Sequence, residues 1–556
     1  MLSAKRRDMA GDHFGRNRKA KIATSRRFNH DWLRRSACKA AAVAAAIFLS
    51  LGTDQQTHAQ TVNFTVIHSF SGTDGTYPES ELVRDASGNL YGTTSHGGDP
   101  GCYSGCGTVF KIDPFGKEAI LHYFTGGTDG ANPYAGLVRD TSGNLYGTTS
   151  SGGTSNDGTV FKIDAVGKES VLHSFNGADG ALPSAGLVLD ASGNLYGTTA
   201  EGGSSACDGV GCGTVFMINS SGNFTIVHYF TGGTDGTRPL AGLVIDSSGN
   251  LYGTTEGGGS GCYGYGCGTV FKIDAEGNES VLHSFSYDNN GTDGMLPHAG
   301  LVLDSSGNLY GTTFVGGSMG SGTVFKIDAE GDESVLHSLN GLADGAYPIA
   351  GLTIDAAGNL YGAATNGGSA GAGNVFRVDP SGNETVIHNF TGGADGASPS
   401  AGLVLDASGN LYGAASFGGP AGYGTVFKIS FPVPFSSFSA KLNIVAGPPP
   451  GFQLQAFFTP GTGASAIDPV ADGMTLTVGT YTVTIPPSSF HQTRKGWWVY
   501  EGKINGVSLD VRISQRGVNP YELQFEASGV DLTSLTNPVT IRLALGNNYG
   551  TTQANQ

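Results

Sequence analysis

The sequence predicts an all-β protein: a seven-bladed β-propeller closed by an N-terminal strand and followed by a C-terminal β-sandwich. The motif Asp-Ala-Ser-Gly-Asn-Leu-Tyr-Gly-Thr-Thr begins at Asp85 and returns nearly unchanged six more times. Its tyrosines are 50 to 58 residues apart, a period in the range of propeller blades. Each period holds four short segments rich in β-branched or aromatic residues and bounded by Gly, Asp, Asn or Pro, which predicts four strands.

The second copy shows the pattern of one unit, with expected strands at 135–139, 144–148, 158–163 and 170–175. The Asp-x-Ser/Ala-Gly turn places Asp first and Gly fourth in a type I turn, so we expect tight hairpins between strands one and two and between strands three and four. The other two links are longer and vary between copies, and they should lie together on the opposite face. Small Ala-Gly pairs at the start of the first strand place that strand innermost.

The two ends of the repeat region indicate a closed ring. The region opens with an unpaired fourth-strand segment at 63–70, and its last copy stops after the third strand at 424–429. The spare strand would complete the last blade and leave no open edge, which a solenoid, the alternative architecture, does not require. We therefore predict a propeller over 60–430, a linker at 431–435 and a β-sandwich over 436–556. Eight strands are expected in the last domain, at 437–445, 452–458, 474–479, 481–486, 496–502, 506–514, 520–526 and 539–545.

Residues 1–59 are interpreted as a basic leader and a signal peptide. Arg34, Arg35 and Lys39 precede an apolar run over 40–51, and a small-x-small site predicts cleavage after Ala59. Twelve apolar residues are too few to cross a bilayer, and no other stretch is long enough, so no membrane span is expected in the mature chain. The protein is therefore predicted to be secreted or held at the cell surface.

The charge distribution argues against nucleic acid as a partner. Residues 1–59 contain 12 of the 30 basic residues and four of the 46 acidic ones, so the remaining chain carries a formal charge of about −24. Such an acidic surface repels phosphate backbones and anionic lipids. The partners that remain are a carbohydrate or a component of the cell envelope.

Six of the seven cysteines form close pairs in the same variable link of three different units. An exported protein favours disulfides, so we predict the bridges Cys102–Cys106, Cys207–Cys212 and Cys262–Cys267. Zinc binding is the competing interpretation, but it needs four ligands brought together from separate blades.

Candidate binding residues are the polar side chains where the variable links depart from the repeat. Two carboxylates and two histidines near a pore mouth would suit acid–base chemistry or a metal, although no spacing motif supports either. No catalytic residue, metal ligand or cofactor is predicted; calcium at the repeated Asp-Gly pairs is the weaker alternative to a turn. The seven histidines repeated in the fourth strand are expected to form hydrogen bonds between blades. The candidate residues at the pore mouth are Glu79, Glu81, His96, Tyr134, Glu256 and His298.

The repeated Gly-Asn-Leu-Tyr-Gly-Thr/Ala-Thr/Ala, Gly-Thr-Val-Phe-Lys-Ile-Asp and Val-Leu-His-Ser-Phe segments resemble the bacterial choice-of-anchor tandem repeat GloVer proteins over about residues 62–430. This resemblance implies export and a variable mode of attachment. The Asp-x-x-Gly-Asn-Leu-Tyr segment is also similar to NHL and gluconolactonase-like propellers, which hold a metal with acidic and Asn residues at the pore. This sequence shows no matching set. A binding or structural module is therefore favoured, and a lactonase-like hydrolase or a lyase acting at the pore mouth is the alternative.

Overall fold

The computed structural model describes residues 62–554 except for short gaps at 99–101, 103, 205, 208, 263–265, 288–291, 446–447, 462–463, 465–466, 518–519, 531, 533–534 and 536. The predicted leader, signal peptide and cleavage site lie outside the described residues. Within them, no helix is long and apolar enough to cross a membrane.

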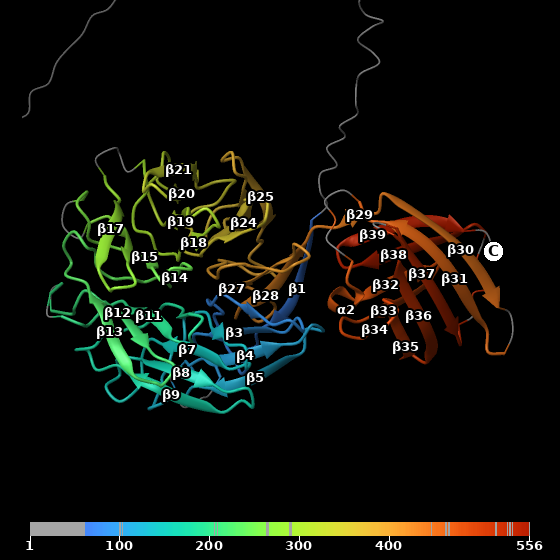
Figure 1. Cartoon of the computed structure of the whole chain (residues 1–556), viewed down its shortest axis with the longest axis horizontal. Helices are drawn as coiled ribbons and strands as arrows, with labels where there is room; N and C mark the ends of the chain where they lie inside the picture. Colours follow the sequence, from blue (N-terminus) through green and yellow to red (C-terminus); the bar gives the residue numbers. More distant parts are fainter. Residues whose placement is uncertain are drawn as a thin grey trace, which may run out of the picture. The chain divides into compact units, whose positions relative to one another are not determined.

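The repeats fold into four-stranded antiparallel sheets, seven in the described part of the chain (Figure 1). We number these sheets one to seven in chain order. Their first strands are β2 (Val83–Arg84), β6 (Val138–Arg139), β10 (Val188–Leu189), β14 (Val244–Ile245), β18 (Val302–Leu303), β22 (Thr353–Ile354) and β26 (Val404–Leu405). Their second strands are β3 (Leu90–Thr94), β7 (Leu145–Thr149), β11 (Leu195–Thr199), β15 (Leu251–Thr255), β19 (Leu309–Thr313), β23 (Leu360–Ala364) and β27 (Leu411–Ala415).

The remaining two strands of each sheet carry most of its pairing. The third strands are β4 (Thr108–Ile112), β8 (Thr159–Ile163), β12 (Thr214–Ile218), β16 (Thr269–Ile273), β20 (Thr323–Ile327), β24 (Asn374–Val378) and β28 (Thr425–Ser430). The fourth strands are β5 (Glu118–Tyr123), β9 (Glu169–Ser174), β13 (Phe224–Tyr229), β17 (Glu279–Ser284), β21 (Glu333–Ser338), β25 (Glu384–Asn389) and, for sheet seven, β1 (Asn63–Ser69). The predicted four strands per repeat are therefore present, and the all-β class is confirmed.

The repeated motif forms the turn between the first two strands. In sheet one, Asp85 Oδ1 accepts hydrogen bonds from the backbone N–H groups of Ser87 and Asn89, each at 2.9 Å. The side chains of Asn89 and Tyr91 donate to Asp85 Oδ2 at 2.8 and 3.0 Å. The motif's tyrosine thus holds the turn from inside the second strand. The first strand pairs over two residues, where five were expected, because the Ala-Gly residues before it pack against neighbouring sheets instead.

Successive sheets pack through phenylalanine pairs at six of the seven junctions, and a buried leucine, Leu339, replaces the first phenylalanine at the other. Phe124, which follows the fourth strand of sheet one, lies edge-on to Phe161 in the third strand of sheet two, with ring centroids 5.1 Å apart. Both rings are completely buried. Gly147 in the second strand of sheet two leaves room for this packing, because a Cβ there would lie 2.7 Å from the Phe161 ring and 2.8 Å from Leu137. A larger side chain at this position would force the two aromatic layers apart.

The N-terminal strand β1 completes the last sheet. It pairs antiparallel with β28 from Asn63↔Ser430 to Ser69↔Thr425, with one bulge between Val66 and His68. Phe70, next to β1, packs edge-on to Phe110 of sheet one at 5.2 Å, repeating the contact made at the other junctions. Sheet seven therefore contacts sheet one in the same way that most sheets contact the next.

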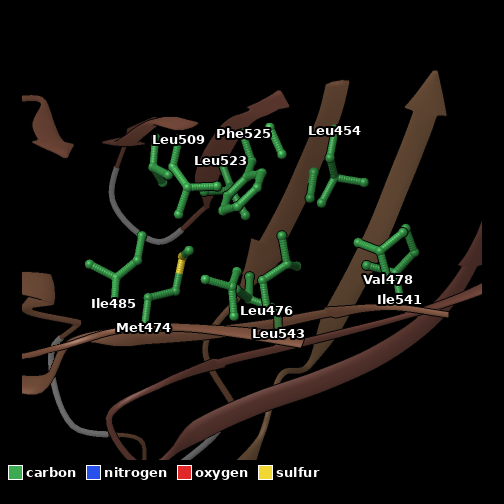
Figure 2. Close-up of a cluster of buried hydrophobic side chains, with 14 of the residues drawn as sticks. Leu454, Met474, Leu476, Val478, Ile485, Leu509, Leu523, Phe525, Ile541 and Leu543 are labelled. Atoms are coloured by element: carbon green, nitrogen blue, oxygen red, sulfur yellow. The ribbon is translucent and has the colours of Figure 1, made fainter. Parts of the chain in front are cut away.

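Residues after the repeats form two further sheets. Their strands are β29 (Val433–Pro434), β30 (Ser437–Val445), β31 (Gly451–Thr459), β32 (Met474–Val478), β33 (Tyr481–Ile485), β34 (His491–Gln492), β35 (Trp498–Ile504), β36 (Val507–Gln515), β37 (Tyr521–Ser528), β38 (Val539–Leu545) and β39 (Asn548–Ala554), with one helical turn, α2 (Pro469–Asp472). The strand orders are β29-β39-β38-β32-β33 and β30-β31-β37-β36-β35-β34. Leu454 and Leu523 of the six-stranded sheet face Leu476 and Leu543 of the five-stranded sheet across one buried core (Figure 2).

Three strands of this region were not predicted. β29 lies in the predicted linker and pairs in parallel with β39, and β39 lies in a mostly polar C-terminal stretch. β34 has only two residues, both exposed. Strands such as β39 are specified by their neighbours, since polar residues form a ladder when an adjacent strand offers its backbone groups.

Replacing Phe70 by Ala tests whether the N-terminal strand is held as firmly as the interior junctions. Phe70→Ala should lower the free energy of unfolding by about 3–5 kcal/mol, the usual cost of removing a buried phenylalanine ring. Phe124→Ala, at the equivalent interior junction, is the matched control and should cost a similar amount in urea denaturation. A cost below about 1 kcal/mol for Phe70→Ala alone would show that the β1 contact is not maintained in solution.

Candidate functional site

The residue before the proline in each fourth-to-first-strand link adopts a left-handed backbone conformation. These residues are Tyr77, Asn132, Leu182, Arg238, Leu296, Tyr347 and Ser398, with φ between 49° and 57°. A residue before proline is normally extended, and a non-glycine residue with positive φ is uncommon. The same unusual conformation at all seven links identifies it as a feature of the fold.

Hydrogen bonds from neighbouring segments stabilise this conformation. The Tyr77 N–H donates to the carbonyl of Tyr423 at 3.1 Å, and the Tyr77 carbonyl accepts from the N–H of Ser95 at 3.1 Å. With both peptide groups paired, the surroundings can maintain a strained backbone. The side chains of Tyr77, Arg238 and Tyr347 consequently contact residues beyond the second strands. The sequence prediction used the residue after each proline and missed Tyr77, Arg238 and Tyr347, which precede it. The variation of this preceding residue among the repeats is the signal that could have indicated them.

One group of side chains, which we call the aromatic row, consists of Phe417, Tyr77, His96 and Tyr134. The Tyr77 ring lies 5.2 Å from Phe417 and 5.6 Å from His96, and His96 lies 6.4 Å from Tyr134, all edge-on. Phe417 is 47% exposed and Tyr134 is 37% exposed. The row therefore offers accessible aromatic surface contributed by the links of sheets seven, one and two.

Glu79 supplies a carboxyl group next to the aromatic row. It accepts a hydrogen bond from the Ser95 hydroxyl, but burial outweighs this bond and raises the pKa of Glu79. Burial and the charge of Glu79 together raise the pKa of Tyr134, while burial lowers the pKa of His96. At neutral pH the row thus combines a neutral imidazole and a phenol that keeps its proton with the adjacent carboxyl group of Glu79, and these groups are hydrogen-bond donors and acceptors beside apolar rings.

A second group, the Glu256 group, lies in the links of sheets four and five. Glu256 Oε1 is 3.2 Å from His298 Nε2, and its Oε2 is 3.0 Å from Arg238 Nη1. The hydrogen bond with His298 lowers the pKa of Glu256; burial opposes this effect and the Arg238 charge reinforces it. His298 also stacks on Phe314, with centroids 4.7 Å apart. The carboxylate is therefore held in place by two partners.

Glu81 lies at the cavity that the beginnings of all seven first strands line. This cavity measures about 470 Å³ and is bordered by Glu81, His298 and the repeated Ala-Gly-Leu segments. The Glu81 side chain is exposed to the lumen, but its carboxyl lies against Gly402, where a Cβ would come within 3.2 Å of it. Protein surrounds the carboxyl on most sides, and this desolvation raises the pKa of Glu81 to about 7. Lumen water moderates the shift without reversing its direction.

The six residues predicted for the pore mouth are therefore distributed over three places. His96 and Tyr134 belong to the aromatic row and Glu79 lies next to it. Glu256 and His298 belong to the second group, and Glu81 lies in the cavity, which His298 also borders. Among the residues that the structure describes, no hydrogen bond or ion pair joins the row to the Glu256 group. All six positions vary between repeats in the sequence. The residues belong to different repeats, however, and therefore lie on different sheets.

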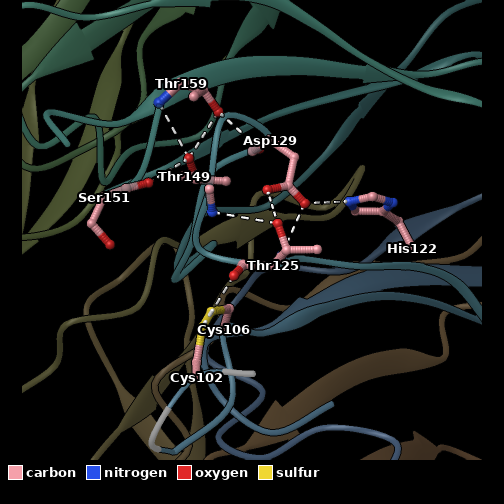
Figure 3. A network of polar contacts seen from close by, with 9 residues as sticks. Cys102, Cys106, His122, Thr125, Asp129, Thr149, Ser151 and Thr159 are labelled. Atoms are coloured by element: carbon pink, nitrogen blue, oxygen red, sulfur yellow. Dashed lines mark hydrogen bonds and ion pairs between the residues drawn. A yellow bond between two sulfur atoms is a disulfide. The ribbon is translucent and has the colours of Figure 1, made fainter. Parts of the chain in front are cut away.

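The three cysteine pairs lie at disulfide distance, in agreement with the predicted bridges. The Cα–Cα separations are 5.6 Å for Cys102–Cys106, 5.4 Å for Cys207–Cys212 and 5.5 Å for Cys262–Cys267. Each bridge closes the link in which it lies. In sheet one, Cys102 also contacts the carbonyl oxygen of Thr125 in the next link at 3.5 Å (Figure 3).

The fold and these links define the class of the protein: an all-β repeat protein built from four-stranded antiparallel sheets, with its sequence variation gathered in the links. The model of the Gloeobacter/Verrucomicrobia repeat family matches residues 50–210, 101–289 and 260–454. The chain belongs to this family. No curated protein matches it significantly.

Solved structures similar to this chain include several enzymes. A gluconolactonase from Xanthomonas campestris is 14% identical over 67% of this chain and 90% of its own, with a TM-score of 0.34. A luciferin-regenerating enzyme is 13% identical over 66% of this chain and 95% of its own, also with a TM-score of 0.34. The Trypanosoma rangeli sialidase, solved with sialic acid, is 9% identical over 87% of this chain and 96% of its own, with a TM-score of 0.31.

The Glu256 group makes stability depend on pH in a defined direction. Because the folded pKa of Glu256 lies below its ordinary value of 4.5, the group's contribution is complete above pH 4.5 and is lost as the pH falls through the folded pKa. Glu256→Gln should therefore lower the free energy of unfolding by about 1 kcal/mol at pH 7, a typical value for a half-buried pair. The penalty should shrink below pH 4.5 when urea midpoints are compared.

Glu201→Gln is the matched control for this prediction. Glu201 occupies the same link position in the preceding repeat, and its side chain has no hydrogen bond or ion pair among the described residues, although its backbone pairs with Ala181. Its replacement should leave the urea midpoint unchanged at both pH values. An equal effect of the two substitutions would contradict the role assigned to His298 and Arg238.

Proposed function

We propose that this protein is a seven-bladed β-propeller whose ring is closed by the N-terminal strand, followed by a β-sandwich, and that it serves as a binding module. The seven four-stranded sheets and the pairing of β1 with β28 support the closed ring. Contacts between the last and first sheets support it further: Arg84 lies 3.9 Å from Asp406 and 5.5 Å from the Tyr412 ring. The single core shared by the two C-terminal sheets supports the sandwich.

The observation that carries the binding role is the aromatic row. Sugar rings present C–H faces that pack on aromatic rings, and their hydroxyl groups form hydrogen bonds with carboxylates and imidazoles. Phe417 and Tyr134 offer the exposed rings, while Glu79 and His96 lie between them. We propose that a carbohydrate of the cell envelope or its surroundings binds along this row.

An extracellular or cell-surface location fits this role. Three cysteine pairs at disulfide distance support an oxidising environment. The strongly acidic chain beyond residue 59 supports a soluble exposed surface and disfavours polyanionic partners.

Carbohydrate binding is tested on a glycan array followed by titration of the glycans that bind. Tyr134→Ala and Phe417→Ala should each weaken binding at least tenfold, since truncating a central aromatic contact commonly costs more than about 1.4 kcal/mol. Tyr549→Ala is the matched control, because Tyr549 is similarly exposed, at 38%, but lies in the C-terminal region. Absence of binding to any glycan, or equal loss in all three variants, would reject the proposal.

The second candidate is an enzyme acting at the cavity, a lactonase-like hydrolase or a lyase. The supporting observation is Glu81, whose carboxyl has a pKa raised by desolvation and lies in a cavity that His298 also borders. A carboxyl with such a pKa suits general acid–base catalysis. With lactone and uronate polysaccharide substrates, Glu81→Gln should lower kcat by about 100-fold or more, whereas Glu79→Gln, outside the cavity lining, should not. Unchanged turnover in Glu81→Gln, or no turnover by the wild type, would exclude this candidate.

A further inference from the structure

The junctions between repeat sheets carry a recurring His–Asp pair. A histidine in each fourth strand approaches the aspartate of the following link, with Nε2–Oδ2 distances of 3.0 to 3.6 Å. Figure 3 shows one example, His122 with Asp129, whose carboxylate also accepts hydrogen bonds from Thr125. These histidines were expected to form hydrogen bonds between blades, and the aspartates to form turns. The structure pairs each histidine with the aspartate of the following link, and the aspartate also accepts hydrogen bonds within its turn. The pairs are His68–Asp74, His122–Asp129, His173–Asp179, His228–Asp235, His283–Asp293, His337–Asp344 and His388–Asp395.

A third side chain reaches each pair from the next sheet. It is the first residue of that sheet's fourth strand, or the equivalent residue of β1. At five junctions this residue is a glutamate: Glu118, Glu169, Glu279, Glu333 and Glu384. At the other two it is a phenylalanine, Phe224 or Phe64. Most junctions therefore hold one imidazole and two carboxyl groups.

The glutamates are incompletely satisfied by the protein. In all five, the Oε1 atom is buried and has no hydrogen-bond partner among the described residues. Burial raises the pKa of Glu118 to about 7; the charge of His68 opposes this shift and that of Asp74 adds to it. Burial and the charge of Asp344 raise the pKa of Glu384 to about 7. A buried carboxylate beside a second one is costly unless a positive charge compensates it.

The two phenylalanine junctions show that the fold does not require this carboxyl group. Phe224 stacks on His173 with ring centroids 3.7 Å apart, and Phe64 stacks on His388 at 3.8 Å. An aromatic ring thus fills the same position without an unpaired polar atom. Packing alone therefore does not explain why five junctions carry a glutamate.

Two junctions gather their donors closely enough to hold one ion. In His68–Asp74–Glu118 and in His337–Asp344–Glu384, one donor atom from each residue lies within 4.8 Å of the others. In the first, His68 Nε2 is 3.3 Å from Asp74 Oδ2 and 3.7 Å from Glu118 Oε2. Donors about 2.0–2.2 Å from a tetrahedral zinc ion are separated by roughly 3.3–3.6 Å, close to these distances.

The aspartates in these two junctions are already oriented. Asp74 Oδ1 accepts hydrogen bonds from the Ser71 N–H and hydroxyl at 2.7 and 2.9 Å, which leaves Oδ2 for the junction. Asp344 Oδ1 likewise accepts from the Asn340 N–H at 2.9 Å. Outer hydrogen bonds of this kind fix a metal ligand before the ion binds.

We propose that these two junctions, His68–Asp74–Glu118 and His337–Asp344–Glu384, bind divalent transition-metal ions of the zinc class. One imidazole with two carboxylates suits zinc better than calcium, which prefers six or more oxygen donors. The bound ion compensates the two negative charges. Its ligands come from a fourth strand, the following link and the next sheet. The first ion therefore connects β1 to sheet one, where the ring closes.

Zinc titration of the full chain tests this proposal independently of any ligand on the aromatic row. Protein without an affinity tag is stripped with a chelator, dialysed and titrated with Zn²⁺, and bound zinc is counted by elemental analysis. At least two and at most five ions per chain should bind, and zinc should raise the thermal unfolding midpoint. Glu118→Phe with Glu384→Phe, which copies the natural phenylalanine junctions, should remove two ions and most of the thermal shift.

Matched histidine variants distinguish the junction sites from surface binding. His68→Gln should remove one ion, whereas His173→Gln, at a phenylalanine junction, should remove none. If the double phenylalanine variant fails to fold, Glu118→Gln with Glu384→Gln provides the same test with side chains of nearly equal shape. Fewer than two ions on the wild type, or a count unchanged in the double variants, would overturn the proposal. Either result would show that the glutamates are neutralised by protons and that any remaining zinc is adventitious.

Discussion

The structure depends on the packing of each repeat sheet against the next. At six of the seven junctions a buried phenylalanine after one sheet's fourth strand meets a buried phenylalanine in the third strand of the following sheet, as Phe124 meets Phe161. The second strand must carry glycine where it faces these rings, which is why Gly147 has no room for a side chain. A sheet of four short strands buries too little by itself, so this contact between neighbours supplies the core. The same contact between Phe70 and Phe110 extends it to the N-terminal strand.

This repeated packing restricts where the protein can vary. The strands, the Asp-x-x-Gly turns and the phenylalanine layers are fixed by the need to match the next sheet, while the links on the opposite face are free to differ. The residue before each proline lies between the repeated strands and the variable links. Its backbone is held in a strained conformation by hydrogen bonds that repeat, yet its side chain changes from Tyr77 to Arg238 to Tyr347. Both groups of candidate binding residues contain a residue from this position, Tyr77 in the aromatic row and Arg238 in the Glu256 group.

The junction polar groups show the same division between a fixed frame and local choice. His–Asp pairs recur at every junction, but the residue that faces them is either a glutamate or a phenylalanine. A stacked ring satisfies the imidazole face with no electrostatic cost, whereas a carboxyl group brings a charge that needs compensation. The glutamate therefore adds to a junction a carboxyl group that can take up a proton or bind a cation, and the phenylalanine adds none.

The sequence by itself determined the all-β class, the four strands of each repeat, the pairing of the spare N-terminal strand with the last sheet and the neighbouring cysteine pairs. These follow from local signals, because turn residues, strand periodicity and short loops act over a few residues. Only the tertiary structure decided which variable residues meet. It separated the aromatic row from the Glu256 group, placed Glu81 in the cavity and brought Glu118 to His68 across a junction. It also turned the polar stretch over 548–554 into a strand by giving it neighbours. Such outcomes depend on contacts between distant segments, which a pattern along one chain does not encode.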